Sequence, residues 1–96
     1  MENKSKVATF IGFSMRARKF KIGVNAVATL KKANLLILCR SASENTKKDA
    51  VKLAKKLRSK LILTVSKDLS EYTHVENGKL MAILDNELAK AIMKNH

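Results

Sequence analysis

LLILCRSASENTKKDAVKLAKKLRSKLILTV, residues 35–65, is the stretch that specifies the fold class. It opens and closes on short apolar runs, residues 35–39 and 61–65, and the segment between them repeats apolar residues at helical spacing. Short apolar runs separated by helical patterns are typical of strands that are covered on both faces of a sheet. The stretch therefore predicts a strand, a helix and a second strand.

The helix in the middle of this stretch is the clearest in the chain. Ser41-Ala42-Ser43-Glu44 has the pattern of a capping box, in which a Ser hydroxyl accepts from a backbone N–H three residues on and Glu44 reaches back. The apolar face consists of Ala50, Leu53, Ala54 and Leu57, and the opposite face carries Lys48, Lys52, Lys55 and Lys56. Lysines placed in this way either keep a helix soluble or contact phosphates. The sequence leaves both interpretations open.

The residues before this stretch continue the alternation of helices and strands. We expect a helix over residues 6–18, whose buried face consists of Val7, Phe10, Ile11 and Ser14. A short strand follows over residues 20–22. Gly23 breaks that strand, and a second helical pattern runs from there to about Lys32.

The residues after the stretch add two more helices and one strand. Ser66 can cap a short helix that runs through Tyr72, and a third apolar run, residues 80–84, predicts a strand. Asp85 or Asn86 can cap a last helix, whose buried stripe is Leu88, Ala91 and Ile92. The whole order predicts one α/β domain over residues 1–96, a three-layer α/β/α sandwich with a small central mixed sheet of about four strands.

Charge is the strongest indication of function. The chain has 20 Lys and Arg against 8 Asp and Glu, a formal net charge of +12. Residues 66–96 hold four basic and five acidic groups, so the excess lies in the first two thirds of the chain. A strongly basic and uneven charge is typical of a docking face for a polyanion.

Several function classes find no support in the residues. The histidines are His74, in a loop, and the C-terminal His96, and Asp68 and Glu71 are best explained as electrostatic stabilisation of a helix N-terminus. The single Cys39 lies in an apolar run, where burial as a small hydrophobe is expected. No nucleotide-binding, hydrolase or metal-ligand motif is present. We therefore expect no catalytic residues, no metal or other cofactor and no small-molecule substrate.

The location of the protein can be predicted from its apolar segments. The basic start, residues 1–6, is not followed by the long apolar core of a secretory signal. No apolar run approaches the ~20 residues that a membrane span needs. We expect a cytoplasmic protein that does not associate with a membrane.

The segment Arg16-Ala17-Arg18-Lys19-Phe20-Lys21-Ile22-Gly23-Val24-Asn25-Ala26 is the main candidate site. Four basic groups precede a glycine that opens a helix, and a glycine permits close approach of a ligand to the backbone. Free N–H groups at a helix start attract anions, and the amide of Asn25 can donate and accept on a base edge. An ordinary turn in which Asn25 caps the helix explains the same pattern equally well.

The chain resembles the kink-turn-binding ribosomal protein family, the relatives of large-subunit ribosomal proteins seven-Ae and thirty-e, and looks most like its short bacterial members. The resemblance covers about residues 7–93 and is carried by residues 11–19, 21–27, 36–38 and 43–48. It implies an α/β/α sandwich that binds RNA through the loop entering the second helix. The family signature there is Gly-Thr-Asn-Glu with a lysine farther on, and Gly23 and Asn25 match it.

Three positions depart from that signature. Val24 stands where threonine is usual, Ala26 where glutamate is usual and Thr29 where the lysine is usual. The family's glutamate and asparagine read guanines of sheared G·A pairs, and a bidentate contact of this kind discriminates by ~1–3 kcal/mol. The resemblance thus implies RNA binding and leaves open whether a standard kink-turn is bound tightly.

The resemblance implies a second RNA-facing loop at residues 74–79, where Val75 supplies the usual apolar contact. The predicted RNA-binding residues are Arg16, Arg18, Lys19, Lys21, Gly23, Asn25, Lys31, Lys32, Val75 and Lys79. The expected partner is structured RNA, ribosomal or another kink-turn RNA, together with ribosomal or translation-associated proteins. The alternative is a protein-interaction module of the translation machinery that kept the fold and lost specific RNA recognition.

Overall fold

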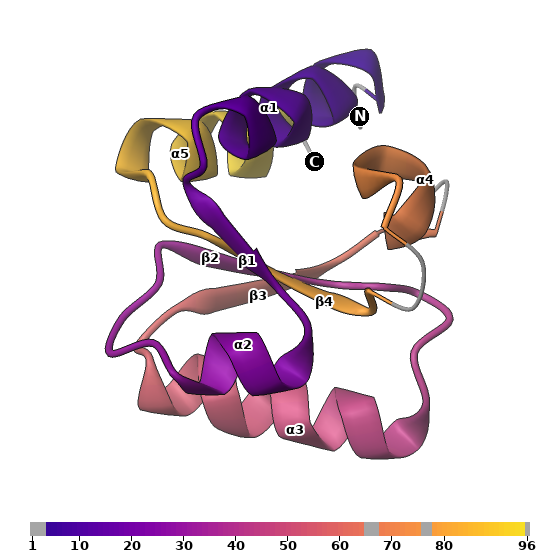
Figure 1. Cartoon of the computed structure of the whole chain (residues 1–96), viewed down its shortest axis with the longest axis vertical. Helices are drawn as coiled ribbons and strands as arrows, with labels where there is room; N and C mark the ends of the chain where they lie inside the picture. The colour runs from indigo at the N-terminus through magenta and orange to yellow at the C-terminus, as the bar shows by residue number, and fades with distance from the viewer. Residues whose placement is uncertain (1–3, 65–67, 76–77, 96) are drawn as a thin grey trace.

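The computed structural model describes residues 4–64, 68–75 and 78–95. Five helices alternate with four strands in the predicted order (Figure 1). The elements are α1 (Lys4–Arg16), β1 (Phe20–Ile22), α2 (Val24–Ala28), β2 (Leu35–Leu38), α3 (Glu44–Lys56), β3 (Lys60–Leu63), α4 (Leu69–Thr73), β4 (Leu80–Ile83) and α5 (Asn86–Asn95).

The strands form one mixed sheet in the order β1-β4-β2-β3. β2 and β3 are parallel, with Leu35 opposite Lys60, and β4 is antiparallel to both β2 and β1. Because β1 and β2 are each antiparallel to the strand between them, β1, β2 and β3 all point the same way. Their amino ends therefore meet at one end of the sheet and their carboxyl ends at the other.

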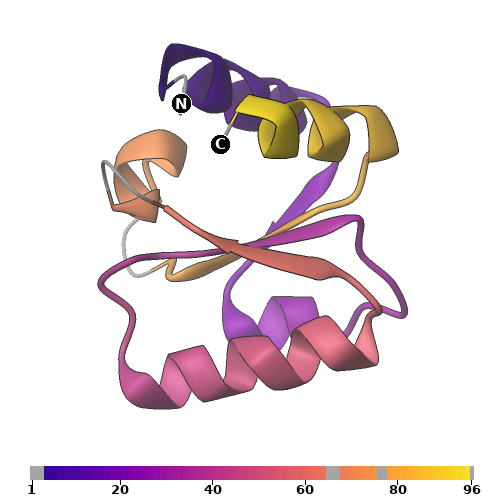
Figure 2. The same cartoon turned by 180° about the vertical axis from the view of Figure 1, so that it is seen from behind.

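Helices cover both faces of the sheet, as Figures 1 and 2 show from opposite sides. On one face, α1, α4 and α5 pack against alternate strand residues such as Ile37 and Met81. On the other face, α2 and α3 pack against the residues between them, such as Leu36 and Ala82. The predicted three-layer α/β/α sandwich with a four-stranded mixed sheet is confirmed.

The three apolar runs are not equivalent in the sheet. All four residues of β2 and all four of β4 are buried, so these two strands are covered on both faces as predicted. The same prediction is wrong for residues 61–65, because β3 lies at the edge of the sheet and Leu63 is 47% exposed. Val65 falls outside the described residues.

The helix starts differ in detail from the sequence prediction. The hydroxyl that caps α3 belongs to Ser43, which accepts from the backbone N–H of Thr46 at 3.2 Å, so the predicted capping box on Ser41 is wrong. Asp85 caps α5 as expected, accepting from the N–H of Leu88 at 3.0 Å. Ser66, the predicted cap of the short helix, falls outside the described residues, and α4 begins after Asp68.

Two helices end earlier than predicted. α1 ends at Arg16 because Arg18 adopts a left-handed conformation, with φ 58°, and the N–H of Lys19 turns back to the carbonyl of Ser14 at 2.9 Å. α2 ends at Ala28, because both the N–H and the hydroxyl of Thr29 donate to the carbonyl of Ala26. The residues up to Lys32 form a loop that leads into β2.

Among the described residues, no helix combines the length and the apolar character that crossing a membrane requires.

Candidate nucleic-acid interface

The loop that opens α2 leaves the carboxyl end of β1. Gly23 has φ 100°, a conformation that L side chains rarely adopt, and its N–H donates to the carbonyl of Leu80 at 2.8 Å. A Cβ built on Gly23 would meet no described atom within 4 Å. The glycine is therefore required by the backbone conformation, and no described residue fills the space beside it.

Asn25 lies in the first turn of α2 and is exposed. Gly23 is the N-cap of α2, and no side chain among the described residues caps the helix, so the interpretation in which Asn25 caps its own helix is wrong. The Asn25 amide is available to a partner. Val24, which stands in the threonine position of the resembled signature, packs against the core between α2 and α3.

The second predicted loop packs directly against the first. A Cβ on Gly78 would come within 2.6 Å of Cγ2 of Ile22, the residue before Gly23, and 3.5 Å from Cγ1 of Val75. Val75 is 37% exposed, which makes it one of the few exposed large apolar side chains among the described residues. Glu76 and Asn77 of this loop fall outside the described residues.

Lys79 connects this loop to the end of β2. Its backbone carbonyl accepts from the N–H of Cys39 at 2.7 Å, and its Nζ lies 3.2 Å from the hydroxyl of Ser41. The structure thus brings together four of the predicted site residues, Gly23, Asn25, Val75 and Lys79, at the end where β1 and β2 finish and β4 begins. We call these four residues the carboxyl-end surface.

Polar side chains that the sequence analysis did not select lie at the same end of the sheet. Arg40 forms an ion pair with Asp68, Nε to Oδ1 at 3.2 Å, and its backbone N–H donates to the hydroxyl of Thr64 at 3.0 Å. Arg40 and Ser41 follow directly after the apolar run 35–39, and that position could have identified them, because the carboxyl ends of parallel strands share one edge.

Cys39 is fully buried beside this group, as the sequence predicted. Burial raises the pKa of its thiol. The hydroxyl of Ser41, the backbone N–H groups of Leu69 and Ser41 and the charge of Lys79 outweigh that effect, so the pKa lies below its ordinary value of 9.0. The thiol has no exposed surface on which a reagent could reach it.

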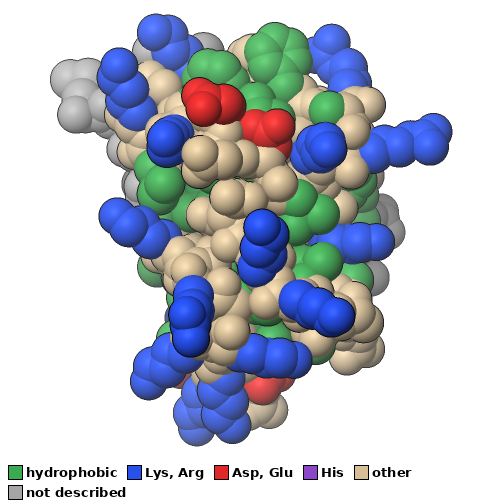
Figure 3. Space-filling model, turned by 90° about the vertical axis from the view of Figure 1, so that its left-hand side faces the viewer, with side chains coloured by type: hydrophobic (Ala, Val, Ile, Leu, Met, Phe, Trp, Pro, Cys, Tyr) green, Lys and Arg blue, Asp and Glu red, His purple; other side chains and the backbone are tan. Residues whose placement is uncertain are grey.

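The remaining predicted residues do not belong to this surface. Arg16, Arg18 and Lys19 lie where α1 ends and β1 begins, and Lys31 and Lys32 lie where α2 leads into β2. Both segments are at the amino end of the parallel strands, and Figure 3 shows Lys and Arg side chains spread over that end of the molecule. Lys21 lies between the two ends, exposed on the edge strand β1.

Arg16 has a defined neighbour on α1. Its guanidinium lies 5.3 Å from the centroid of the Phe13 ring, which in turn packs edge-on against Phe10 at 6.2 Å. Phe13 is 43% exposed, so the arginine covers part of an aromatic face. This contact explains Arg16 without a nucleic acid.

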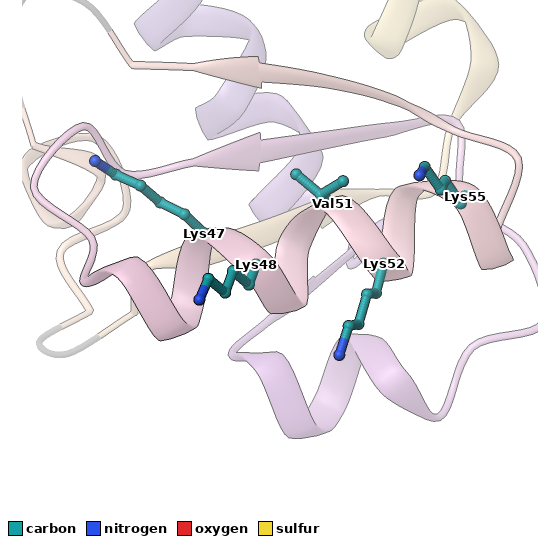
Figure 4. A pocket seen from close by; sticks show the side chains of 5 residues that line it. All are labelled: Lys47, Lys48, Val51, Lys52 and Lys55. Carbon is teal, nitrogen blue, oxygen red and sulfur yellow. The ribbon is translucent and has the colours of Figure 1, made fainter.

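The lysines of α3 form a separate feature. Four of them, Lys47, Lys48, Lys52 and Lys55, surround the exposed Val51 in a shallow depression of about 410 Å³ (Figure 4). The side chains of Lys47, Lys48 and Lys52 extend in different directions, and Lys47 lies 3.6 Å from Glu44. The depression is too open to enclose a ligand. The structure therefore does not decide between the two interpretations of these lysines, helix solubility and phosphate contact.

Acidic and histidine side chains are scattered in the structure. Within residues 4–64, 68–75 and 78–95, no three His, Cys, Asp or Glu side chains gather into a possible metal site. The carboxylate of Glu71 accepts from the N–H of Asp68 at 2.9 Å, which supports the assignment of this pair to the start of α4. His74 is exposed at the end of α4, and His96 falls outside the described residues.

Comparison with known proteins supports the fold alone. The chain matches no protein-family model and no curated protein. Its fold is similar to the solved structure of a protein with unknown function from Bacillus halodurans C, with a TM-score of 0.76 and 19% sequence identity. That similarity covers 93% of this chain and 94% of the other.

Proposed function

We propose that this chain is an RNA-binding module that holds structured RNA against the carboxyl-end surface. The observation that carries the proposal is the contact between the two loops that the sequence selected separately, since Gly78 packs against Ile22, the residue before Gly23. Segments about fifty residues apart in the chain thereby lie beside each other.

The chemistry of this surface suits a folded RNA. Gly23 leaves room for a backbone to approach, the exposed amide of Asn25 offers a donor and an acceptor to a base edge, and Val75 offers an apolar contact. Exposed aromatic rings, on which single strands stack, are absent from this surface. Recognition of RNA shape fits these residues better than threading of a single strand.

The net charge of +12 supplies affinity that does not depend on sequence. Specificity then has to come from base contacts, and Asn25 is the side chain on this surface that can make a two-point contact with a base. A kink-turn with sheared G·A pairs is the first RNA to test, because the family that the sequence resembles binds that element.

The test compares a simple kink-turn RNA with a control RNA in which the G·A pairs are replaced, over a salt series. We expect tighter binding to the kink-turn that persists at physiological salt. Asn25→Ala should lower the affinity for the kink-turn by about 5- to 150-fold, the equivalent of ~1–3 kcal/mol, with little effect on the control RNA. Asn86→Ala, at the exposed first position of α5, is the matched control and should bind normally. Equal and steeply salt-dependent binding to both RNAs would contradict the proposal.

The edge strand β3 favours a second candidate function. β3 is an edge strand of the described sheet, and the side chain of Leu63 at its end is 47% exposed. An edge strand with an exposed apolar side chain can accept a strand from a protein partner. This candidate predicts a complex with a ribosomal or translation-associated protein that survives high salt and is weakened by Leu63→Lys.

A further inference from the structure

Three basic loops meet at the amino end of the sheet. Because β1, β2 and β3 are parallel, the segments that enter them lie at the same end although they are far apart in sequence. These segments carry six exposed cations, Arg18, Lys19, Lys31, Lys32, Arg58 and Lys60, which we call the amino-end face. Figure 3 views this end and shows Lys and Arg side chains across it, with Asp and Glu side chains between them in the upper part of the view and near its lower edge.

Arg18 and Arg58 occupy equivalent positions in two of these loops. Both have left-handed backbones, with φ 58° and φ 53°, at the ends of α1 and α3. The residue after each one donates its N–H back into the helix at 2.9 Å, Lys19 to Ser14 and Ser59 to Ala54. Helices that end in this way usually place glycine there, since other residues are strained in that conformation. At both positions the chain carries a long cation instead.

Helix stability alone does not account for these two arginines. Cations near the end of a helix interact well with its dipole, but Arg16 already fills that role on α1, and Lys55 and Lys56 fill it on α3. Glycine would relieve the strain. His74, the third non-glycine residue with a positive φ in the described chain, lies at the opposite end of the sheet. Two strained arginines on one surface indicate that their charge serves a function other than helix stability.

The amino-end face is suited to phosphate groups. The ion pairs found among the described residues do not involve any of its six cations. The exposed large apolar side chains of the described residues, Phe13, Val51, Leu63 and Val75, come from none of its three loops. A surface that binds at a lipid interface usually carries apolar anchors besides its cations, so a nucleic-acid backbone fits this face better.

We infer that the amino-end face binds a second segment of RNA backbone, separate from the RNA held at the carboxyl-end surface. The choice of RNA as partner rests on the proposed function. The two surfaces lie at opposite ends of the sheet in a molecule that measures 29 × 25 × 23 Å, so one RNA has to fold back or present two segments to reach both. The amino-end face contributes affinity without reading bases, and the carboxyl-end surface contributes the selectivity.

The test is a double variant, Arg18→Gly with Arg58→Gly, which removes two charges and also relieves both left-handed positions. Because glycine suits these positions, the variant should melt at the same temperature as the parent chain or higher. Each cation that contacts a phosphate adds about 0.7–0.9 to the slope of log affinity against log salt, so the slope should become shallower by about 1.4–1.8. Taken from equal binding at 1 M salt, this change in slope corresponds at 0.15 M salt to roughly 14- to 30-fold weaker binding, equally for the kink-turn and the control RNA.

Two further variants separate the position of the charge from its amount. Arg18→Lys with Arg58→Lys keeps both charges and should retain the salt slope of the parent chain. Lys90→Gln with Lys94→Gln removes two exposed charges from α5 and should also leave the slope unchanged, because these lysines lie outside the amino-end face.

The outcomes distinguish this inference from the proposed function. An unchanged slope in the glycine variant, an equal fall in the α5 variant, or binding to anionic lipid vesicles in place of RNA would overturn the inference. If the unmodified chain does not prefer the kink-turn RNA, the proposed function is contradicted. The slope experiment then still tests whether the amino-end face contacts phosphates. A shallower slope with the kink-turn preference retained supports two separate contact surfaces.

Discussion

Replacing each of the three glycines by alanine should change the stability of this protein in different directions. Gly12 lies inside α1, where the described atom nearest to a new Cβ would be Nη2 of Arg16, at 4.0 Å. Since glycine is about 0.8–1.0 kcal/mol worse than alanine within a helix, Gly12→Ala should raise the free energy of unfolding by up to about 1 kcal/mol. In a domain of this size that is roughly 4–8 °C in melting temperature.

The other two substitutions should destabilise the fold for separate reasons. Gly23→Ala meets no described atom, but φ 100° is strained for alanine, and such strain costs about 1–3 kcal/mol. Gly78→Ala places a Cβ 2.6 Å from Cγ2 of Ile22, and overpacking of this kind typically costs about 1–3 kcal/mol. That methyl group is attached to the branched Cβ and cannot swing away easily, so β1 or the loop has to shift.

Urea unfolding of the three variants in one buffer measures the changes in the free energy of unfolding. A compensating variant tests whether the clash with Ile22 is what destabilises Gly78→Ala. Ile22→Leu moves the branch point away from Gly78 and should recover part of the loss when combined with Gly78→Ala, which a double-mutant cycle detects. Gly78→Ala should also weaken RNA binding, because the displaced loop carries Val75, whereas Gly12→Ala should bind normally. The reasoning is refuted if Gly78→Ala is as stable as the parent chain, or if Gly12→Ala is the least stable of the three.

Three further effects can be measured on the purified protein. Ser43→Ala should lower the free energy of unfolding by about 1 kcal/mol in urea titrations, because the N–H of Thr46 loses its cap, and an unchanged value would place the cap elsewhere. Cys39 should react with a disulfide reagent at least roughly a hundredfold more slowly than in the unfolded chain despite its lowered pKa, since its side chain is fully buried and a local opening that costs about 3 kcal/mol lowers the reactive population by that factor. Arg18→Gly and Arg58→Gly should each raise the free energy of unfolding by up to about 1 kcal/mol, and calorimetry that finds a loss would show that these arginines stabilise the fold.

The candidate site was only partly predictable from sequence. The segment 16–26 looked like one basic site because its residues are consecutive, but β1 carries the chain from one end of the sheet to the other within that segment. Arg18 therefore lies at the amino end and Asn25 at the carboxyl end. Conversely, only the family resemblance assigned Val75 and Lys79 to the same site as Gly23. The structure gives a physical reason for that assignment, because Gly78 packs on Ile22.

The order of elements followed from the sequence alone because it depends on local spacing. Apolar runs of five residues, the helical repeat of α3 and the turn at Gly23 are each legible within a short window. The same local information did not distinguish β3 from β2, since both are short apolar runs, and only the strand order reveals which one lies at the edge.

Only the tertiary structure decided which charges lie together. The parallel direction of β1, β2 and β3 is a property of pairing between distant segments, and it gathers Arg18, Lys31 and Arg58 at one end of the molecule. The left-handed backbones of Arg18 and Arg58 also depend on how each helix ends against the sheet. The sequence by itself determined that the protein is basic and α/β, because composition and spacing are local, and the long-range pairing of strands determined where its charge can meet a partner.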